Sequence, residues 1–222
     1  MFNNLDATNF SGAIPFYDTN FEDLLSKITI CYKKMAKEHL QLQNKENAIR
    51  DILLLKYLKN DDVREEVGLV GLYNFEREVQ EDNSKGRTDI KVTSQETFKK
   101  QKAYYTIECK RLDKDNLKGR TGLNAEYVIN GISRFTTRYY SSFYRVNAMI
   151  GFIVEKLDIH ENTTKHINSI LTTDSSIQTT EEITKDNFIK NFEFHYHSKH
   201  MDIENQELKI YHLMFDFSSN MQ

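Results

Sequence analysis

Two residue types that constrain protein chains are scarce in this sequence of 222 residues. Proline occurs once, at Pro15, so almost nothing would interrupt a helix by removing a backbone donor. The two cysteines, Cys31 and Cys109, are too few for a disulfide framework and lack the spacing of metal ligands. We therefore expect reduced thiols and a cytoplasmic protein.

Long apolar runs are missing as well. No run reaches the roughly 18 consecutive apolar residues that identify a membrane-spanning helix. The start of the chain, MFNNLDATNFSG, has neither the basic head nor the apolar centre of a signal peptide. Hydrophobic residues make up 39% and charged residues 28% of the chain, which is typical of a globular protein and argues against wholesale disorder. We expect a single domain over residues 1–222 that does not associate with membranes.

The chain as a whole also lacks a strong charge of either sign, because its net charge is -3. The stretch from Lys99 to Arg145 is different: it contains eleven Lys or Arg and four Asp or Glu, a local charge of +7. Such a stretch can be a set of solvated loop and helix faces. It can also form an electropositive surface for the phosphate backbone of a nucleic acid.

Apolar residues recur at helical or strand spacing along most of the chain. Helical spacing predicts helices over residues 21–43, 45–60, 122–142 and 160–172, with a short helical turn at 61–71. Alternating or continuous apolar segments predict strands over residues 73–81, 87–93, 102–112, 146–157, 191–202 and 208–217. Polar connections are expected between the second and third strands and at 172–182. This order predicts an α/β fold, a mixed sheet with helices on its faces.

Charged residues end the strand predicted at 102–112, in the segment YYTIECKRLD. Because strand side chains alternate, Glu108 and Lys110 share one face and Cys109 points to the other. If Asp89 lies on the neighbouring strand, two carboxylates converge, which is costly unless a cation lies between them. Oxygen ligands of this kind suit Mg²⁺ or Mn²⁺, and the backbone carbonyl of Cys109 is a natural further ligand.

Such a site predicts hydrolysis of a phosphodiester bond. A divalent cation can polarise a phosphoryl oxygen and lower the pKa of a bound water. Lys110 could orient or deprotonate that water and offset charge in the transition state. Glu46, on the preceding helix, is a possible third acidic ligand, or it forms an ordinary surface pair with Arg50 four residues later. Without a cation, Glu108 and Lys110 would be a solvated strand-end pair.

The same residues carry a resemblance to a known family. With Asp89 at the head of one strand, Glu108-Cys109-Lys110 at the end of the next, a helix containing Glu46 before them and a helix from residue 123 after them, the chain resembles the PD-(D/E)XK nuclease superfamily. Thr88 stands where the family name has proline. The resemblance covers residues 45–155 and implies a restriction-endonuclease-like αβββαβ core, with a helical extension at 1–44 and a helix and strand pair at 156–222.

The resemblance also implies a function. It implies a metal-dependent nuclease acting on DNA in restriction, phage defence or repair. Asp89 and Glu108 would be ligands of Mg²⁺ or Mn²⁺, and Lys110 would act on the attacking water and the transition state. The alternative is an inactive subunit with the nuclease fold that binds nucleic acid or serves assembly. A homodimer, or a partner subunit that supplies target specificity, fits either case. Candidate phosphate contacts, which could instead be plain surface residues, are Arg111, Lys114, Lys118 and Arg120. Arg134 could line a substrate groove or have a packing role.

A second possible metal site is less consistent with the sequence. Four histidines lie on the last two predicted strands, and the pair His195 and His197 could face one way. No cysteine or carboxylate completes a tetrahedral zinc set at the usual spacing. We therefore expect no zinc site there.

Overall fold

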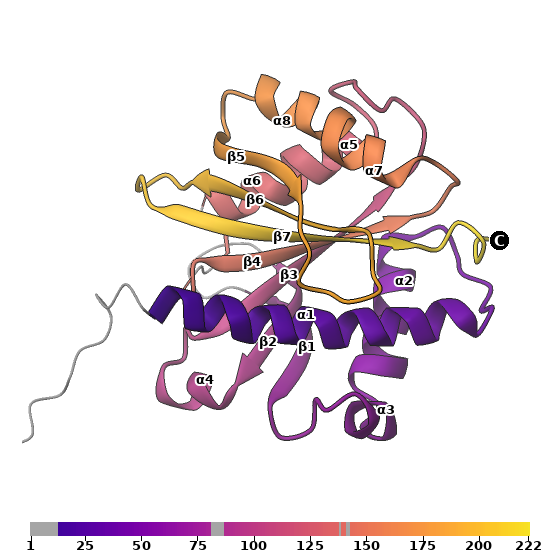
Figure 1. Ribbon diagram of the computed structural model, residues 1–222, viewed down its shortest axis with the longest axis vertical. Coiled ribbons are helices and arrows are strands. Elements are labelled where there is room, and N and C mark those ends of the chain that lie inside the picture. Colours follow the sequence, from indigo (N-terminus) through magenta and orange to yellow (C-terminus); the bar gives the residue numbers. More distant parts are fainter. Residues whose placement is uncertain (1–12, 81–86, 138, 141–142) are drawn as a thin grey trace, which may run out of the picture.

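The computed structural model describes residues 13–80, 87–137, 139–140 and 143–222, with side chains from Tyr17 onward (Figure 1). Short π-helical segments, labelled η, continue several of the α-helices. The elements are α1 (Ala13–Lys37), α2 (Glu46–Ile52), η2 (Leu53–Leu58), α3 (Asp61–Glu66), β1 (Tyr73–Gln80), β2 (Arg87–Ser94), α4 (Gln95–Lys99), β3 (Tyr104–Leu112), α5 (Leu123–Tyr127), η3 (Val128–Ile132), α6 (Ser133–Thr136), β4 (Val146–Ile153), α7 (Ile159–Glu161), η4 (Asn162–Ile167), α8 (Asn168–Thr173), β5 (Gln178–Lys185), β6 (His195–Met201) and β7 (Glu207–Asp216).

Seven strands of the described residues form one mixed sheet in the order β1-β2-β3-β4-β7-β6-β5. The three strands β1, β2 and β3 form an antiparallel meander, and β5, β6 and β7 form another. Strand β4 lies between the two meanders and pairs in parallel with β3 and β7. The expected α/β class, with a mixed sheet flanked by helices, is confirmed.

Helices cover both faces of this sheet, as Figure 1 shows with α1 and α2 on one side and α5, α6 and α8 on the other. The α1 face is closed by a row of side chains at helical spacing, which are fully buried: Phe21, Leu24, Leu25, Ile28, Cys31 and Met35. The helices from α5 to α8 bury a second apolar cluster, which includes Tyr127, Ile132 and Phe135. Alternation divides the central strands between the two layers, since Ile150 packs in the first cluster and Met149 in the second.

All eight residues of strand β4 are buried, as the continuous apolar run of its sequence requires. Its glycine, Gly151, is the register partner of Lys110 on β3. A Cβ atom at Gly151 would come within 2.5 Å of the Met214 sulfur and 2.7 Å of a Leu112 methyl carbon. Only glycine therefore allows Leu112 and Met214 to pack this closely beside the end of β3.

Several predicted boundaries were wrong. The segment predicted as a polar loop at 172–182 contains the start of β5, an edge strand in which only Ile183 is buried, so its composition resembles that of a loop. The first helix ends at Lys37 instead of residue 43, because Leu42 forms a parallel bridge with Met221. The helix expected over 122–142 ends at Thr136, and residues 138 and 141–142 lie outside the described part of the chain. The short helix α4 was not predicted; it is stabilised by a capping box between Ser94 and Thr97.

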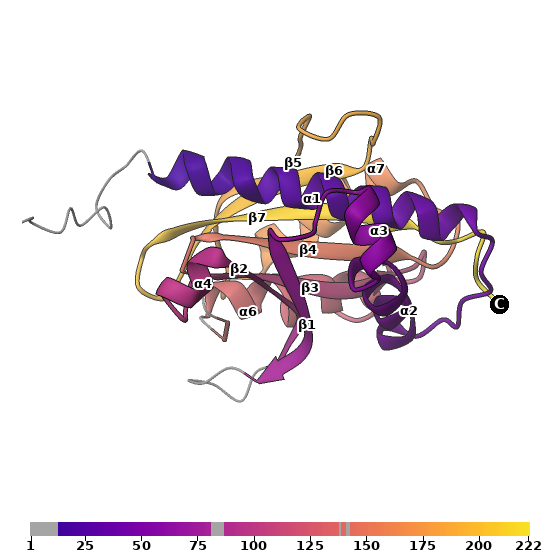
Figure 2. The same cartoon turned by 90° about the horizontal axis from the view of Figure 1, so that it is seen from below.

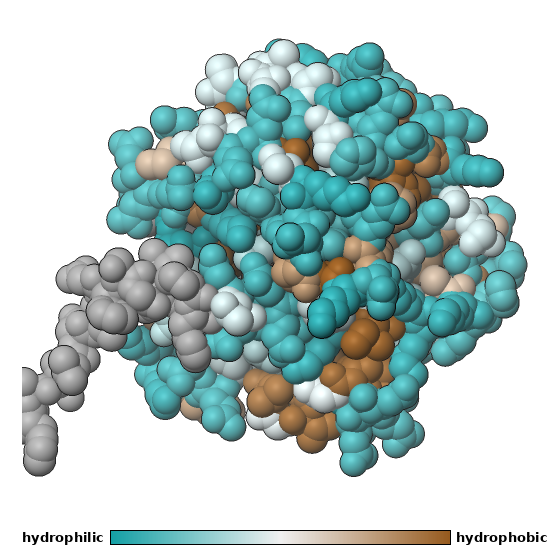
Figure 3. Space-filling view, viewed as in Figure 1, coloured by the Kyte–Doolittle hydropathy of each residue, from teal (hydrophilic) through white to brown (hydrophobic). Residues whose placement is uncertain are grey.

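The surface of this view is mostly hydrophilic, with apolar atoms gathered in its lower part (Figure 3). Val70 and Leu72, in the connection between α3 and β1, are among the exposed large apolar residues. None of the helices in the described ranges combines the length and the apolar character that crossing a membrane requires.

The C-terminal histidines form a buried chain of hydrogen bonds. His212 bonds the Tyr127 hydroxyl through Nδ1 (2.8 Å) and the Ser198 hydroxyl through Nε2 (2.8 Å), and Ser198 in turn bonds His200 Nε2 (2.7 Å). Burial lowers the pKa of His200 to about 4, and burial also lowers the pKa of His212 well below its usual value. His197 is different, since hydrogen bonding to Asp186 raises its pKa.

These buried histidines predict how stability depends on pH. A histidine whose folded pKa is depressed stays neutral in the folded state while its unfolded form takes up a proton below pH ~6.5, so stability is lost as the pH falls from there toward about 4. Each such group contributes a slope of up to about 1.4 kcal/mol per pH unit. Urea unfolding of the wild type and of His200→Gln at pH 7, 6 and 5 should show a shallower decline in the variant. Parallel curves would contradict the prediction.

Candidate active site

Strands β2 and β3 separate at the predicted site. Their antiparallel ladder ends at the pair Ile90 and Ile107, after which β2 continues beside β1 and β3 continues beside β4. Asp89 and Glu108 are the next residues on each strand. The backbone N–H of Cys109, which has passed the end of the ladder, donates to Asp89 Oδ2 at 2.8 Å. Asp89 therefore accepts a hydrogen bond from a backbone N–H that has no β2 carbonyl opposite it.

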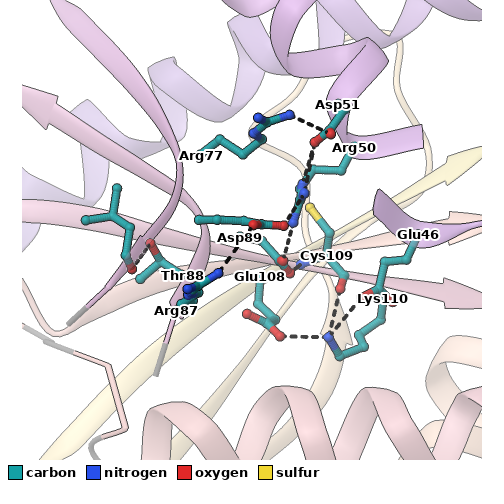
Figure 4. A network of polar contacts seen from close by, with 12 residues as sticks. Glu46, Arg50, Asp51, Arg77, Arg87, Thr88, Asp89, Glu108, Cys109 and Lys110 are labelled. Atoms are coloured by element: carbon teal, nitrogen blue, oxygen red, sulfur yellow. Dashed lines mark hydrogen bonds and ion pairs between the residues drawn. The ribbon is translucent and has the colours of Figure 1, made fainter. Parts of the chain in front are cut away.

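The other oxygen of Asp89 binds an arginine from α2. Arg50 Nη1 donates to Asp89 Oδ1 at 2.8 Å, and the same guanidinium donates to Asp51 (2.9 Å) and Glu78 (2.8 Å). The Arg50 side chain is 2% exposed. Figure 4 shows the Asp89 carboxylate directed toward Arg50, and the Glu108 carboxylate directed elsewhere. Arg50 thus joins β1, β2 and α2 through three carboxylates.

Glu108 is fully buried and bonds a different set of donors. Its Oε1 accepts from Lys110 Nζ at 2.7 Å and from Arg134 Nη1, and its Oε2 accepts from the Tyr140 hydroxyl at 2.6 Å. Burial, reinforced by the negative charge of Asp89, raises the pKa of Glu108 to about 7, although Lys110 and Arg134 act in the opposite direction. The Glu108 carboxyl can therefore gain or lose a proton near neutral pH.

Lys110 lies at the centre of the predicted ligands. Its Nζ donates to Glu108 Oε1, to the carbonyl oxygen of Cys109 at 3.0 Å, and to Glu46 Oε1 at 3.4 Å. Burial would lower the pKa of Lys110, but the Glu108, Glu46 and Asp89 carboxylates outweigh it and raise the pKa above its usual value. In this arrangement Lys110 is an ammonium ion, a hydrogen-bond donor and not a base.

The oxygen atoms around Lys110 are of the type that binds a hard divalent cation. Oxygens of Glu46, Glu108 and the Cys109 backbone already surround one cationic group, the Lys110 ammonium, and oxygen-only donor sets suit Mg²⁺ or Mn²⁺. Asp89 is held apart from them by Arg50. In the ranges that the structure describes, no three His, Cys, Asp or Glu residues gather as a group able to hold an ion.

A cleft of about 940 Å³ opens on Glu46 and Lys110. It is also lined by Arg111, a predicted phosphate contact, and by Arg134, a predicted groove residue. Arg134 also bonds Glu108, and Arg111 Nη1 donates to the side chain and the carbonyl of Asn44. The complete lining comprises Lys45, Glu46, Asn47, Ala48, Asp51, Lys110, Arg111, Leu123, Glu126, Asn130 and Arg134.

The other three predicted phosphate contacts lie on the connection between β3 and α5. Lys114, Lys118 and Arg120 are exposed, and Lys114 pairs with Glu155 at 3.6 Å. Both ends of this connection line the cleft, at Arg111 and at Leu123. The three side chains therefore project from a segment that borders the cleft without lining it.

The basic stretch does not form one surface. Lys99, Lys100 and Lys102 precede β3, whereas the residues near the cleft follow it, and a strand of nine residues extends about 30 Å. Figure 2 shows α4 and α2 on opposite sides of β1. Of the remaining basic residues, Arg145 pairs with Asp202. The described basic residues of this part of the sequence are therefore divided between different regions of the surface, and Arg138 lies outside the described residues.

Arg50 is the site residue that the sequence interpretation missed. Glu46 and Arg50 were considered as a surface pair, but Glu46 accepts from Lys110 and from the backbone N–H of Arg111, and Arg50 is buried against Asp89. A signal was present, because Arg50 falls within the apolar stripe of α2 and η2, beside Ile49 and three residues before Leu53. An arginine on a buried helix face needs acidic partners.

Comparison with protein-family models, with curated proteins and with solved structures finds no match for this chain. The functional argument for the chain therefore depends on its own residues and their geometry.

The contacts of Glu108 predict the effect of removing one of its cations. Arg134→Gln should raise the pKa of Glu108 further above about 7, by about one unit or more, because an opposite charge in direct contact is lost. Titration followed by ¹³C NMR of the glutamate carboxyls would measure this shift. Lys165→Gln, which removes a cation from an exposed pair on η4, serves as the control and should leave the Glu108 titration in place. An unchanged or lower Glu108 pKa in Arg134→Gln would contradict the assigned contact.

Proposed function

We propose that this protein is a metal-dependent nuclease of the PD-(D/E)XK type, with a restriction-endonuclease-like core, that hydrolyses phosphodiester bonds of DNA. The observation that carries the proposal is the fork of β2 and β3, where Asp89 and Glu108 follow the last pair of the ladder and Lys110, which binds Glu108, lines a cleft. The order of elements from α2 through β1, β2, β3 and α5–α6 to the parallel strand β4 is consistent with the αβββαβ arrangement.

The chemistry follows from the residues at the fork. A bound Mg²⁺ or Mn²⁺ would polarise a phosphoryl oxygen and lower the pKa of a water. Glu108, Glu46 and the Cys109 carbonyl would hold the cation, with Asp89 as the ligand from β2. Lys110, with its Nζ between these oxygens, would donate to the attacking water or to a phosphoryl oxygen and so offset the charge that develops in the transition state.

The alternative is a nucleic-acid-binding or assembly subunit with the same fold and no activity. One observation favours it: the Glu108, Glu46 and Cys109 oxygens are already engaged by the Lys110 ammonium, so the network is a closed set of ion pairs as it stands. Binding of DNA without cleavage under all metal conditions would support this alternative.

A cleavage assay tests the proposal. The wild type should cut supercoiled or linear DNA with Mg²⁺ or Mn²⁺ and should be inactive with chelator. Asp89→Asn, Glu108→Gln and Lys110→Ala should each lose about 100-fold or more in rate, because each removes stabilisation of the transition state. Parallel reactions on RNA establish the substrate class.

The fold of each variant needs its own measurement, since Glu108 and Lys110 are buried. Circular dichroism and thermal unfolding would show that the variants remain folded, and Lys165→Ala on the surface of η4 provides a variant that should cut at the wild-type rate. Full activity in any two of the three site variants would refute the assignment.

The position of the basic residues predicts which of them contact DNA. Reversal of Lys114, Lys118 and Arg120 together to Glu should weaken DNA binding and reduce its salt dependence, which on duplex DNA has a slope of about −0.9 per phosphate neutralised. Reversal of Lys99, Lys100 and Lys102 to Glu makes the same change of charge on the far side of β1 and should have a much smaller effect. Fluorescence anisotropy at several salt concentrations measures both. Equal losses in the two triple variants would mean that the cleft does not define the binding surface.

A further inference from the structure

Asp89 is directed away from the other predicted ligands. One of its oxygens binds Arg50 and the other binds the Cys109 N–H, whereas Glu108 binds Lys110 and Arg134 on the other side of the fork. A carboxylate in this position can join a shared cation site only if it turns away from Arg50. The energetic cost of that movement depends on what Arg50 binds afterward.

Arg50 binds two carboxylates in addition to Asp89. Its side chain is 2% exposed, and a guanidinium buried to this extent without a carboxylate partner would be strongly destabilising. Besides Asp89, it donates to Asp51 at 2.9 Å and to Glu78 at 2.8 Å. Asp51 is shared with Arg77 at 2.7 Å, whereas the second cation near Glu78, Arg87, is 3.8 Å away, so Glu78 is the partner more able to compensate Arg50.

Glu78 reaches Arg50 through an unusual backbone conformation. Its φ is 49°, in the left-handed region that residues other than glycine rarely adopt and that costs energy in the middle of a strand. The β1–β2 register passes from the pair Arg77–Ile90 to the pair Val79–Thr88 and omits Glu78 and Asp89. The strained residue is therefore directly opposite Asp89.

The left-handed backbone changes the direction of the Glu78 side chain. Successive side chains of a regular strand point to opposite faces, so Arg77 and Glu78 should face opposite ways. Instead, both bind side chains of α2, since Arg77 pairs with Asp51 and Glu78 with Arg50. The left-handed backbone of Glu78 brings its carboxylate to the side where Arg50 lies.

We propose that Glu78 and Arg50 form a positioning pair for Asp89, in which Glu78 retains the Arg50 guanidinium when the Asp89 carboxylate turns from Arg50 toward a divalent cation. This inference rests on the proposed function, because it takes a divalent cation as the ligand that Asp89 gains. Neither Glu78 nor Arg50 is a ligand of the cation. Their effect on its binding is indirect, through the freedom of Asp89 to leave Arg50.

Calorimetry with Mn²⁺ alone tests this role. Glu78→Gln keeps the size of the side chain and removes its charge, so Arg50 depends more strongly on Asp89. The variant should bind Mn²⁺ about 10- to 100-fold more weakly than the wild type, the range typical of residues that support a metal ligand from outside. Glu76→Gln removes the same charge from an exposed position on the same strand and should bind Mn²⁺ with wild-type affinity.

A second variant separates positioning from stability. Glu78→Gly accepts the left-handed backbone without steric cost and also lacks the carboxylate. In chelator, Glu78→Gly should unfold at a higher temperature than Glu78→Gln, because glycine relieves the backbone strain. The Mn²⁺ affinity of Glu78→Gly should nevertheless be as low as that of Glu78→Gln. If affinity instead followed stability and returned to the wild-type value in Glu78→Gly, the role of Glu78 would be structural and the inference would be wrong.

The remaining outcomes are also decisive. Wild-type affinity for Mn²⁺ in Glu78→Gln would overturn the positioning pair while leaving the proposed metal site intact. A wild-type protein that binds no divalent cation would refute the proposed function and the inference together. The two failures are therefore distinguished by the wild-type titration.

Discussion

A carboxylate that is buried beside a second carboxylate destabilises a protein unless cations lie against both, because neither charge can be solvated by water. Glu108 is such a group, fully buried and close enough to Asp89 for that charge to raise its pKa. The surrounding structure supplies the cations from separate elements: Lys110 from β3 itself, Arg134 from α6 and, for Asp89, Arg50 from α2. The fork of the two strands therefore determines which side chains the flanking helices must present.

Charges at the fork balance within the described residues. Five carboxylates form ion pairs with five cations in two groups, each of which is balanced. The first group consists of Asp51, Glu78 and Asp89 with Arg50, Arg77 and Arg87. The second consists of Glu46 and Glu108 with Lys110 and Arg134. The most buried members, Glu108 and Arg50, each have more than one partner. Such redundancy means that one bond can be exchanged without leaving a buried charge unpaired, which a single buried pair would not permit.

The sequence was sufficient to predict the strands that carry the site and the shared face of Glu108 and Lys110, because alternation and burial are local properties of a strand. Asp89 and Glu108 were predicted to converge, and they do occupy adjacent positions where β2 and β3 separate, but Asp89 binds Arg50 instead. That contact joins residues 39 positions apart. It depends on the packing of α2 against the meander, which no local pattern specifies. The left-handed conformation of Glu78 is equally hidden, since glutamate gives no sequence signal for it.

A balanced network has a consequence for substrate binding in the proposed function. Without a divalent cation, and with Glu108 ionised, the ion-paired residues of the fork carry no net charge, so they offer little attraction to a phosphodiester, and the cleft is lined by Glu46, Asp51 and Glu126 as well as by basic residues. A divalent cation would add two positive charges to an otherwise neutral set. One is matched by the phosphodiester in the ground state, and the second by the negative charge that develops as water attacks. A site that is neutral when empty would thus stabilise the transition state more than the substrate, which is the condition for catalysis as opposed to tight binding.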